Sequence, residues 1–100
     1  MNGTNKENVG VWIKQKGEIN KARIGYILRE QMNGHYPTFD EIVKNNHSDR
    51  AFFAVGLLLY EGVKNGTIMR EDKRFYLNED LLPEIKAALG MEYVTFEISN

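Results

Sequence analysis

The sequence predicts a small α+β domain: three core helices, a β-hairpin after them, a C-terminal helix, and a short strand near each end of the chain. Two observations predict this class. Apolar residues recur at helical spacing in 20–33, 39–45 and 49–64, and residues 67–78 alternate between apolar and polar around a polar turn. A chain of 100 residues has room for one hydrophobic core, so we expect a single domain.

The longest apolar stretch, SDRAFFAVGLLLYEGVK, predicts the central helix of the domain. Ser48 offers a side-chain acceptor before the helix-periodic run, so the helix is expected to begin at or near Asp49. Its end is expected between Glu61 and Asn65, where glycines can supply a left-handed capping residue. The hairpin then follows directly, with its turn at Glu71-Asp72-Lys73.

Two shorter helices precede this one. Asn20 can cap the first, and Gly34 is placed to end it. Thr38 and Glu41 form the capping-box pattern, which predicts a second helix over 39–45. The core is then predicted to consist of the apolar residues that these periodicities place on one face of each element: Ile24, Ile27, Leu28, Phe39, Ile42, Val43, Phe52, Val55, Leu59, Ile68, Phe75 and Leu77.

Both ends of the chain show strand-like alternation. Val9–Ile13 alternates with period two, and so does Tyr93–Ile98. Between the hairpin and the second of these segments, Leu81–Leu89 predicts a helix with Pro83 in its first turn and a glycine stop after it. Because a lone strand leaves its ladder groups unpaired, we expect the two strands to pair, within one chain or between two.

The order of helix, extended link, short helix, turn, long helix and hairpin is that of a winged helix-turn-helix. LLYEGV at 58–63, followed by a ribbon ending in RFYLN, resembles the third helix and wing of winged-helix domains. More narrowly, AVGLLLYEG at 54–62 is similar to a family of small prokaryotic winged-helix proteins. The resemblance covers about 20–78 and implies a fold that serves DNA binding and protein binding alike.

The expected domain organisation follows from these elements. Residues 1–8 are expected to be a disordered tail, and 9–100 a single winged-helix domain. Within that domain 20–78 forms the core, and 79–100 is a helix and strand extension.

Composition excludes several classes of protein. There is no cysteine, no apolar run long enough to cross a bilayer and no hydrophobic leader, so we expect a cytoplasmic protein with no membrane partner. His35 and His47 are 12 residues apart, which is not a metal-ligand spacing. No glycine-rich phosphate loop or nucleophile pattern occurs, so we expect no metal, no cofactor, no catalytic residue, no small-molecule substrate and no enzymatic activity.

One functional hypothesis is a regulator that binds double-stranded DNA. Fold analogy supports it, and residues 21–78 carry a net charge of +2 against −4 for 79–100. In this hypothesis the hairpin charges grip the DNA backbone or minor groove, and an arginine at the start of the third helix sets the register. The candidate nucleic-acid-binding residues are Lys21, Arg23, Arg50, Lys64, Arg70, Lys73 and Arg74.

The other hypothesis is a protein-interaction or homodimerisation module. A DNA-reading helix normally presents arginine, lysine, asparagine or glutamine to the major groove. Here the centre of the outer face of the third helix is Phe53, Ala54 and Leu57, which favours contact with protein. The alternative is that the C-terminal helix folds back and covers these residues, and the pattern alone weighs the two equally.

Overall fold

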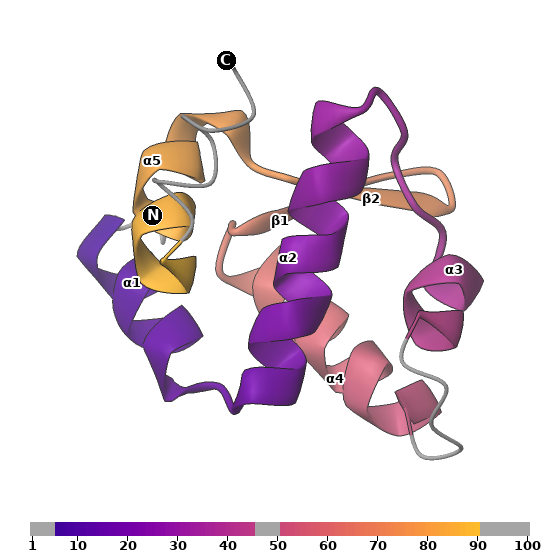
Figure 1. Ribbon diagram of the computed structural model, residues 1–100, viewed down its shortest axis with the longest axis horizontal. Coiled ribbons are helices and arrows are strands. Elements are labelled where there is room, and N and C mark those ends of the chain that lie inside the picture. The colour runs from indigo at the N-terminus through magenta and orange to yellow at the C-terminus, as the bar shows by residue number, and fades with distance from the viewer. Residues whose placement is uncertain (1–5, 46–50, 91–100) are drawn as a thin grey trace.

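The computed structural model describes residues 6–45 and 51–90 of the chain. In these residues the fold is α+β, with five α-helices, one 3₁₀ turn and a two-stranded antiparallel hairpin. Figure 1 shows α2 (Glu18–Met32) crossing the middle of the molecule, with α1 (Lys6–Gln15) and α5 (Leu82–Leu89) on one side and α3 (Phe39–Lys44) on the other. The helix α4 (Ala51–Lys64) and the hairpin lie behind α2 in this view.

The predicted strand Val9–Ile13 is wrong, because this segment lies within α1. Val9 and Ile13 are buried one helical turn apart, and the helix packs against α5. Two side chains four residues apart lie on the same face in both a strand and a helix. The burial of these two residues therefore agrees with a strand as well as with a helix. The helix also begins at Lys6, inside the segment expected to be a tail.

Helix α2 begins two residues before the predicted cap at Asn20. Gly17 occupies the N-cap position and makes no side-chain cap hydrogen bond, while Asn20 lies inside the helix. The predicted end is confirmed, because Gly34 follows the helix with φ of 83°. The apolar stripe of Ile24, Ile27 and Leu28 is buried as expected.

Helix α3 confirms the capping box. Thr38 Oγ1 accepts a hydrogen bond from the Glu41 backbone N–H at 3.3 Å, and the Glu41 carboxylate accepts one from the Thr38 N–H at 2.8 Å. Ile42 on this helix is completely buried. The predicted start of the next helix, at Ser48 and Asp49, lies outside the described residues.

Helix α4 ends at Lys64, within the predicted interval, but its buried face differs from the prediction. Phe52 was placed in the core and is 57% exposed, whereas Leu58 was not placed there and is 1% exposed. The buried face consists of Ala51, Val55, Leu58, Leu59 and Gly62. Apolar residues surround this helix on nearly every side, so its apolar periodicity only weakly specifies which side faces the core.

The hairpin confirms the sequence prediction to within one residue. β1 (Ile68–Glu71) and β2 (Arg74–Leu77) pair with Ile68 opposite Leu77 and Arg70 opposite Phe75. Asp72 in the turn has φ of 59°, a left-handed conformation that aspartate tolerates better than most residues. Ile68 and Leu77 are buried, and Ile68 packs against α4 at Gly62, so the hairpin is fixed to the end of that helix.

The outer edges of β1 and β2 differ in their hydrogen-bond partners. Outside β2, the Phe75 N–H donates to the Pro37 carbonyl at 2.9 Å. The Gln31 side-chain amide donates to the Leu77 carbonyl at 3.1 Å and accepts from the Leu77 N–H at 2.6 Å. In the described part of the chain no strand pairs with the outer edge of β1.

After the hairpin, a 3₁₀ turn (η1, Glu79–Leu81) leads into α5, which ends at Gly90 with φ of 70°, as predicted. Helix α5 packs on α1 and leaves Phe53 and Leu57 exposed, so the alternative in which this helix covers them is wrong. The predicted strand Tyr93–Ile98 lies outside the described residues. Its predicted pairing with a strand at 9–13 is excluded, because that segment is helical.

Candidate functional site

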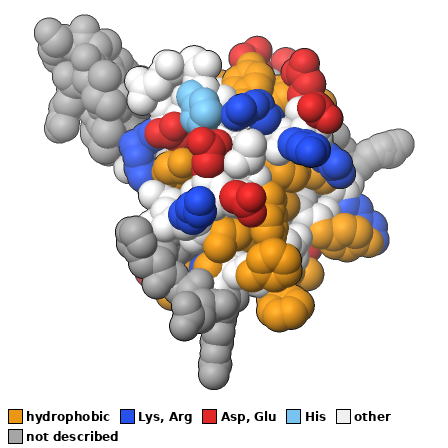
Figure 2. Space-filling view, turned by 90° about the vertical axis from the view of Figure 1, so that its right-hand side faces the viewer, with side chains coloured by type: hydrophobic (Ala, Val, Ile, Leu, Met, Phe, Trp, Pro, Cys, Tyr) orange, Lys and Arg blue, Asp and Glu red, His pale blue; other side chains and the backbone are white. Residues whose placement is uncertain are grey.

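The candidate site begins with the exposed side of α4. Phe53 is 82% exposed, and Leu57 and Tyr60 follow it at positions i+4 and i+7 with 58% and 63% exposure. Phe52 and Val63 flank this row and are also exposed. We call these five residues the α4 outer face. Figure 2 views the side of the molecule on which α3 lies and shows apolar side chains over the lower part of the surface, with charged side chains above them.

Two of the three residues predicted from sequence as a protein interface are exposed to solvent. Phe53 and Leu57 are exposed on α4, and Ala54 is half-buried between them and the core. Sequence reasoning assigned Phe52 to the core, and it did not identify Tyr60 and Val63 as part of this surface. The spacing of Phe53, Leu57 and Tyr60 along one helical stripe is the signal that could have identified the whole face.

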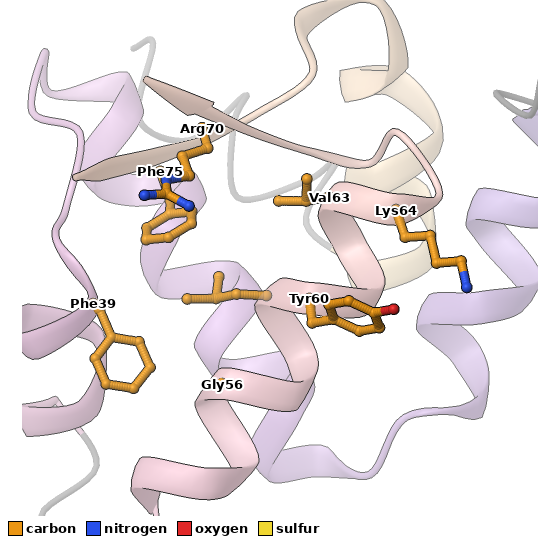
Figure 3. Close-up of a pocket in the computed structure, with 8 residues that line it drawn as sticks. Phe39, Gly56, Tyr60, Val63, Lys64, Arg70 and Phe75 are labelled. Carbon is orange, nitrogen blue, oxygen red and sulfur yellow. The ribbon is translucent and has the colours of Figure 1, made fainter. Parts of the chain in front are cut away.

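A groove lies between the α4 outer face, α3 and the hairpin (Figure 3), with a volume of about 530 Å³. Phe39 of α3 and Phe75 of β2 line one end, while Tyr60, Val63 and Lys64 line the side formed by α4. Gly56 keeps the middle open, because it has no side chain to project between α4 and the Phe39 ring. The groove therefore combines an aromatic floor with an open mouth.

The charged residues at this groove are basic. Lys64 and Arg70 line it together with uncharged residues, and no acidic side chain is among those that line it. The Lys64 ammonium lies 5.8 Å from the centroid of the Tyr60 ring, a cation–π contact that holds the charge beside the apolar surface. Arg70 Nε donates to the Asp72 carbonyl at 2.8 Å, which positions this arginine along the hairpin.

Glu61 joins α4 to α1. Its carboxylate accepts hydrogen bonds from the Lys16 ammonium and, at 3.1 Å, from Trp12 Nε1. These two hydrogen bonds, that of Lys16 being the stronger cause, lower the pKa of Glu61. The negative charge of Glu61 therefore points toward α1. The charged residue that follows the α4 outer face in sequence is Lys64, at the end of the helix.

Two of the predicted nucleic-acid-binding residues, Arg23 and Lys21, lie on α2, and their side chains contact neighbouring residues of the same helix. Arg23 is 5% exposed and donates to Asn20 Oδ1 at 2.6 Å, and burial lowers the pKa of its guanidinium. Lys21 forms an ion pair with Glu18 at 3.5 Å. A buried Arg23 is not placed to contact a phosphate backbone, and Arg50 lies outside the described residues.

The remaining predicted basic residues gather around the hairpin. Arg70, Lys73 and Arg74 are all exposed, and Arg70 and Lys73 line a second shallow groove with Asp40 of α3. Arg74 donates to the Tyr36 carbonyl at 2.7 Å and lies 3.8 Å from the Glu41 carboxylate. The hairpin thus presents a small basic surface adjacent to the apolar groove.

The ionisable residues around α3 have a structural role. His35 Nε2 lies 3.1 Å from Glu41 Oε1, the same carboxylate that caps α3. The backbone hydrogen bond from Thr38 is the main cause that lowers the pKa of Glu41, followed by interaction with His35. Within residues 6–45 and 51–90, no group of three or more histidine or acidic side chains is arranged to hold a metal ion.

Comparisons of the chain with protein-family models, with curated proteins and with solved structures found no match. None of the described helices has the length and apolar character that spanning a bilayer requires.

Proposed function

We propose that this chain is a non-enzymatic protein-binding module of the winged helix-turn-helix type, which contacts its partner through the α4 outer face. The order α2, α3, α4 and hairpin is compatible with that fold and supports the assignment. The observation that carries the proposal is the composition of α4: the helix that would read DNA presents two phenylalanines, a leucine and a tyrosine to solvent.

The area of this surface is sufficient for the centre of an interface. A fully exposed aromatic side chain presents about 200 Å², so the exposed fractions of Phe52, Phe53 and Tyr60 together amount to roughly 400 Å². That is about half of one partner's share of a standard protein interface, and aromatic residues are the usual energetic centres of such contacts. Leu57 and Val63 extend the same surface.

A panel of peptides displayed on phage tests the proposal. The wild-type protein should enrich apolar peptides, and Leu57→Asp should abolish their binding, because a buried unpaired carboxylate is costly in an apolar contact. Ile19→Asp is the matched control, since Ile19 is an aliphatic residue of similar exposure on α2. If both variants bind the selected peptides as the wild type does, the α4 outer face is not the binding surface.

DNA binding is the second candidate, and the exposed Arg70, Lys73 and Arg74 on the hairpin favour it. Fluorescence anisotropy with a labelled duplex at increasing salt separates the two functions. A DNA-binding protein should lose affinity steeply with salt, because phosphate contacts release counterions. Absence of binding at low salt, together with peptide binding that depends on Leu57, assigns the surface to protein.

A further inference from the structure

We propose that the partner of the α4 outer face is a second copy of this chain, packed across a two-fold axis with the two α4 helices antiparallel at Leu57. In this pair the Phe53 ring of each copy enters the groove of the other. The inference rests on the proposed function and names the partner. Four observations support it: the places of ring and groove along α4, the side on which the ring lies, the charges, and the area of the surface.

The exposed ring and the groove lie on opposite sides of Leu57 along the same helix. Phe53 is 82% exposed and precedes Leu57 by one helical turn. Tyr60 and Val63, which line the groove, follow Leu57 (Figure 3). An antiparallel two-fold at Leu57 places each Phe53 about 6 Å beyond the crossing on the other copy, at the level between Tyr60 and Val63. One helix therefore carries both halves of a self-complementary contact.

The position of Phe53 on α4 is also rotated toward the groove. At 3.6 residues per turn, Phe53 lies about 40° around the helix from Leu57, in the same sense as Gly56 and Val63, which line the groove. An antiparallel two-fold keeps the grooves of the two copies on the same side of the helix pair. Each ring is therefore directed toward the groove of the other copy.

The lining of the groove suits an aromatic ring. Phe39, Tyr60 and Phe75 line it, and aromatic rings pack favourably on one another in edge-to-face and offset arrangements. Gly56 leaves the middle open, since a Cβ at this position would have Phe39 Cε1 as its nearest neighbour, at 3.9 Å. The volume of about 530 Å³ accommodates a phenylalanine side chain.

The charges favour the antiparallel direction. Lys64 lies at the C-terminal end of α4, next to the α4 outer face. Parallel helices would bring the two Lys64 ammonium groups together, whereas antiparallel helices that cross at Leu57 separate these residues by about 21 Å along the helix axis. That distance exceeds the Debye length of about 8 Å at physiological salt, so the antiparallel pair avoids the repulsion.

The area of the surface meets the requirement for a weak dimer. The exposed parts of Phe52, Phe53 and Tyr60 present roughly 400 Å², and Leu57 and Val63 add roughly 150 Å². Two copies therefore bury about 1,100 Å² from these residues, just above the roughly 1,000 Å² that a specific interface needs. We expect dissociation in the micromolar range.

Sedimentation equilibrium of the full-length chain measures this self-association. The wild type should pass from monomer to dimer as its concentration rises through the micromolar range. Leu57→Asp should weaken the dimer by about 100-fold or more, because it buries two like charges at the axis. Ile19→Asp, at a residue of similar exposure on α2, should have no effect. A wild type that stays monomeric, or a dimer that Leu57→Asp leaves unchanged, overturns the proposal.

Mixing two variants tests the contact between ring and groove. Phe53→Ala removes both rings from a homodimer, and Gly56→Leu fills both grooves. The mixed dimer retains one intact contact, between the Phe53 ring of the Gly56→Leu copy and the open groove of the Phe53→Ala copy. We expect its dissociation constant to be several-fold below the geometric mean of the two homodimer values. A value at the geometric mean, which independent effects would give, overturns the proposal.

Both variants should fold. Phe53 is exposed, and a Cβ at Gly56 meets only an ordinary contact. Circular dichroism checks this before the variants are mixed.

Cysteine cross-linking tests the direction of the helices, because the protein has no cysteine of its own. Leu57→Cys should form a disulfide between two copies under mild oxidation, since the two residues meet at the axis. Lys64→Cys should react several-fold more slowly, because these residues lie at opposite ends of the contact. Faster cross-linking at Lys64 overturns the antiparallel arrangement.

The failure of this inference differs from the failure of the proposed function. A monomeric wild type whose selected peptides still depend on Leu57 rejects the second copy and leaves the proposed function standing. A dimer that depends on Leu57, with no external peptide enriched, supports the second copy and limits the α4 outer face to self-association. A monomer that binds no peptide rejects both.

Discussion

Replacing Gly62 by alanine should destabilise the protein, whereas replacing Gly56 by alanine should stabilise it. Both glycines lie inside α4, so each substitution gains the same helix propensity, about 0.5–1 kcal/mol. The difference between them comes from what the added methyl group meets. At Gly56 the nearest atom is Cε1 of Phe39 at 3.9 Å, an ordinary contact.

At Gly62 the added Cβ would lie 2.3 Å from Cδ1 and 2.6 Å from Cγ1 of Ile68. Ile68 is 1% exposed, so its side chain has no free space into which to move. Overpacking of this kind costs about 1–3 kcal/mol, which exceeds the propensity gain. We therefore expect a net loss of roughly 0.5–2 kcal/mol for Gly62→Ala, and a gain of up to about 1 kcal/mol for Gly56→Ala.

Guanidinium unfolding of both variants beside the wild type measures these effects. The midpoints should move in opposite directions with an unchanged slope. Ile68→Val shortens the obstructing side chain, so it should reduce the cost of Gly62→Ala in a double-mutant cycle. Equal stabilisation by the two alanine substitutions would mean that α4 does not approach β1 as the structure has it.

Three further predictions concern the core, acid stability and the hairpin. Leu58→Ala should lower the free energy of unfolding by about 2–5 kcal/mol, while Leu57→Ala should lower it by less than about 1 kcal/mol. Equal losses on denaturant unfolding would mean that the side of α4 that faces the core is not the observed one. Hydrogen bonds lower the folded-state pKa of Glu41 and Glu61 below the usual 4.5. The stability that these two carboxylates contribute is therefore fully present above pH 4.5, and it is lost as the pH falls through their folded-state pKa values. Unfolding curves across this range should show a smaller pH dependence in Glu41→Gln, and an unchanged dependence contradicts the assignment. Neutralising Arg70, Lys73 and Arg74 together should remove any duplex-DNA affinity measured by anisotropy without altering the circular dichroism of the fold, and retained affinity would place DNA contact elsewhere.

Features with a local chemical cause were predictable from the sequence. The capping box at Thr38 and Glu41, the stops at Gly34 and Gly90, and the hairpin turn all depend on residues within a few positions of one another. Such features follow from backbone conformations and hydrogen bonds that only certain residue types provide. The order of helices and hairpin from α2 to α5 could therefore be predicted without knowledge of tertiary contacts.

Features that depend on distant contacts were predicted less well. Val9–Ile13 became a helix because α5 buries its apolar side, a contact between opposite ends of the sequence. The burial of Arg23 and the contact of Glu61 with Trp12 depend likewise on neighbours that no local pattern reveals. The exposure of Phe53 and Leu57 was predicted from the helical periodicity, but the groove depends on the spatial meeting of Phe39, Gly56 and Phe75.

The error in the phase of α4 has a physical cause that bears on function. A surface helix usually has a polar face, and that face identifies the buried one by contrast. On α4 the outward positions are apolar, so Phe52 could be mistaken for a core residue and Leu58 for an ordinary neighbour. Exposed phenylalanines add little to folding stability, because they stay largely in water in the folded state. Their presence along one helix is therefore not explained by folding, and it agrees with the proposed contact with a protein partner.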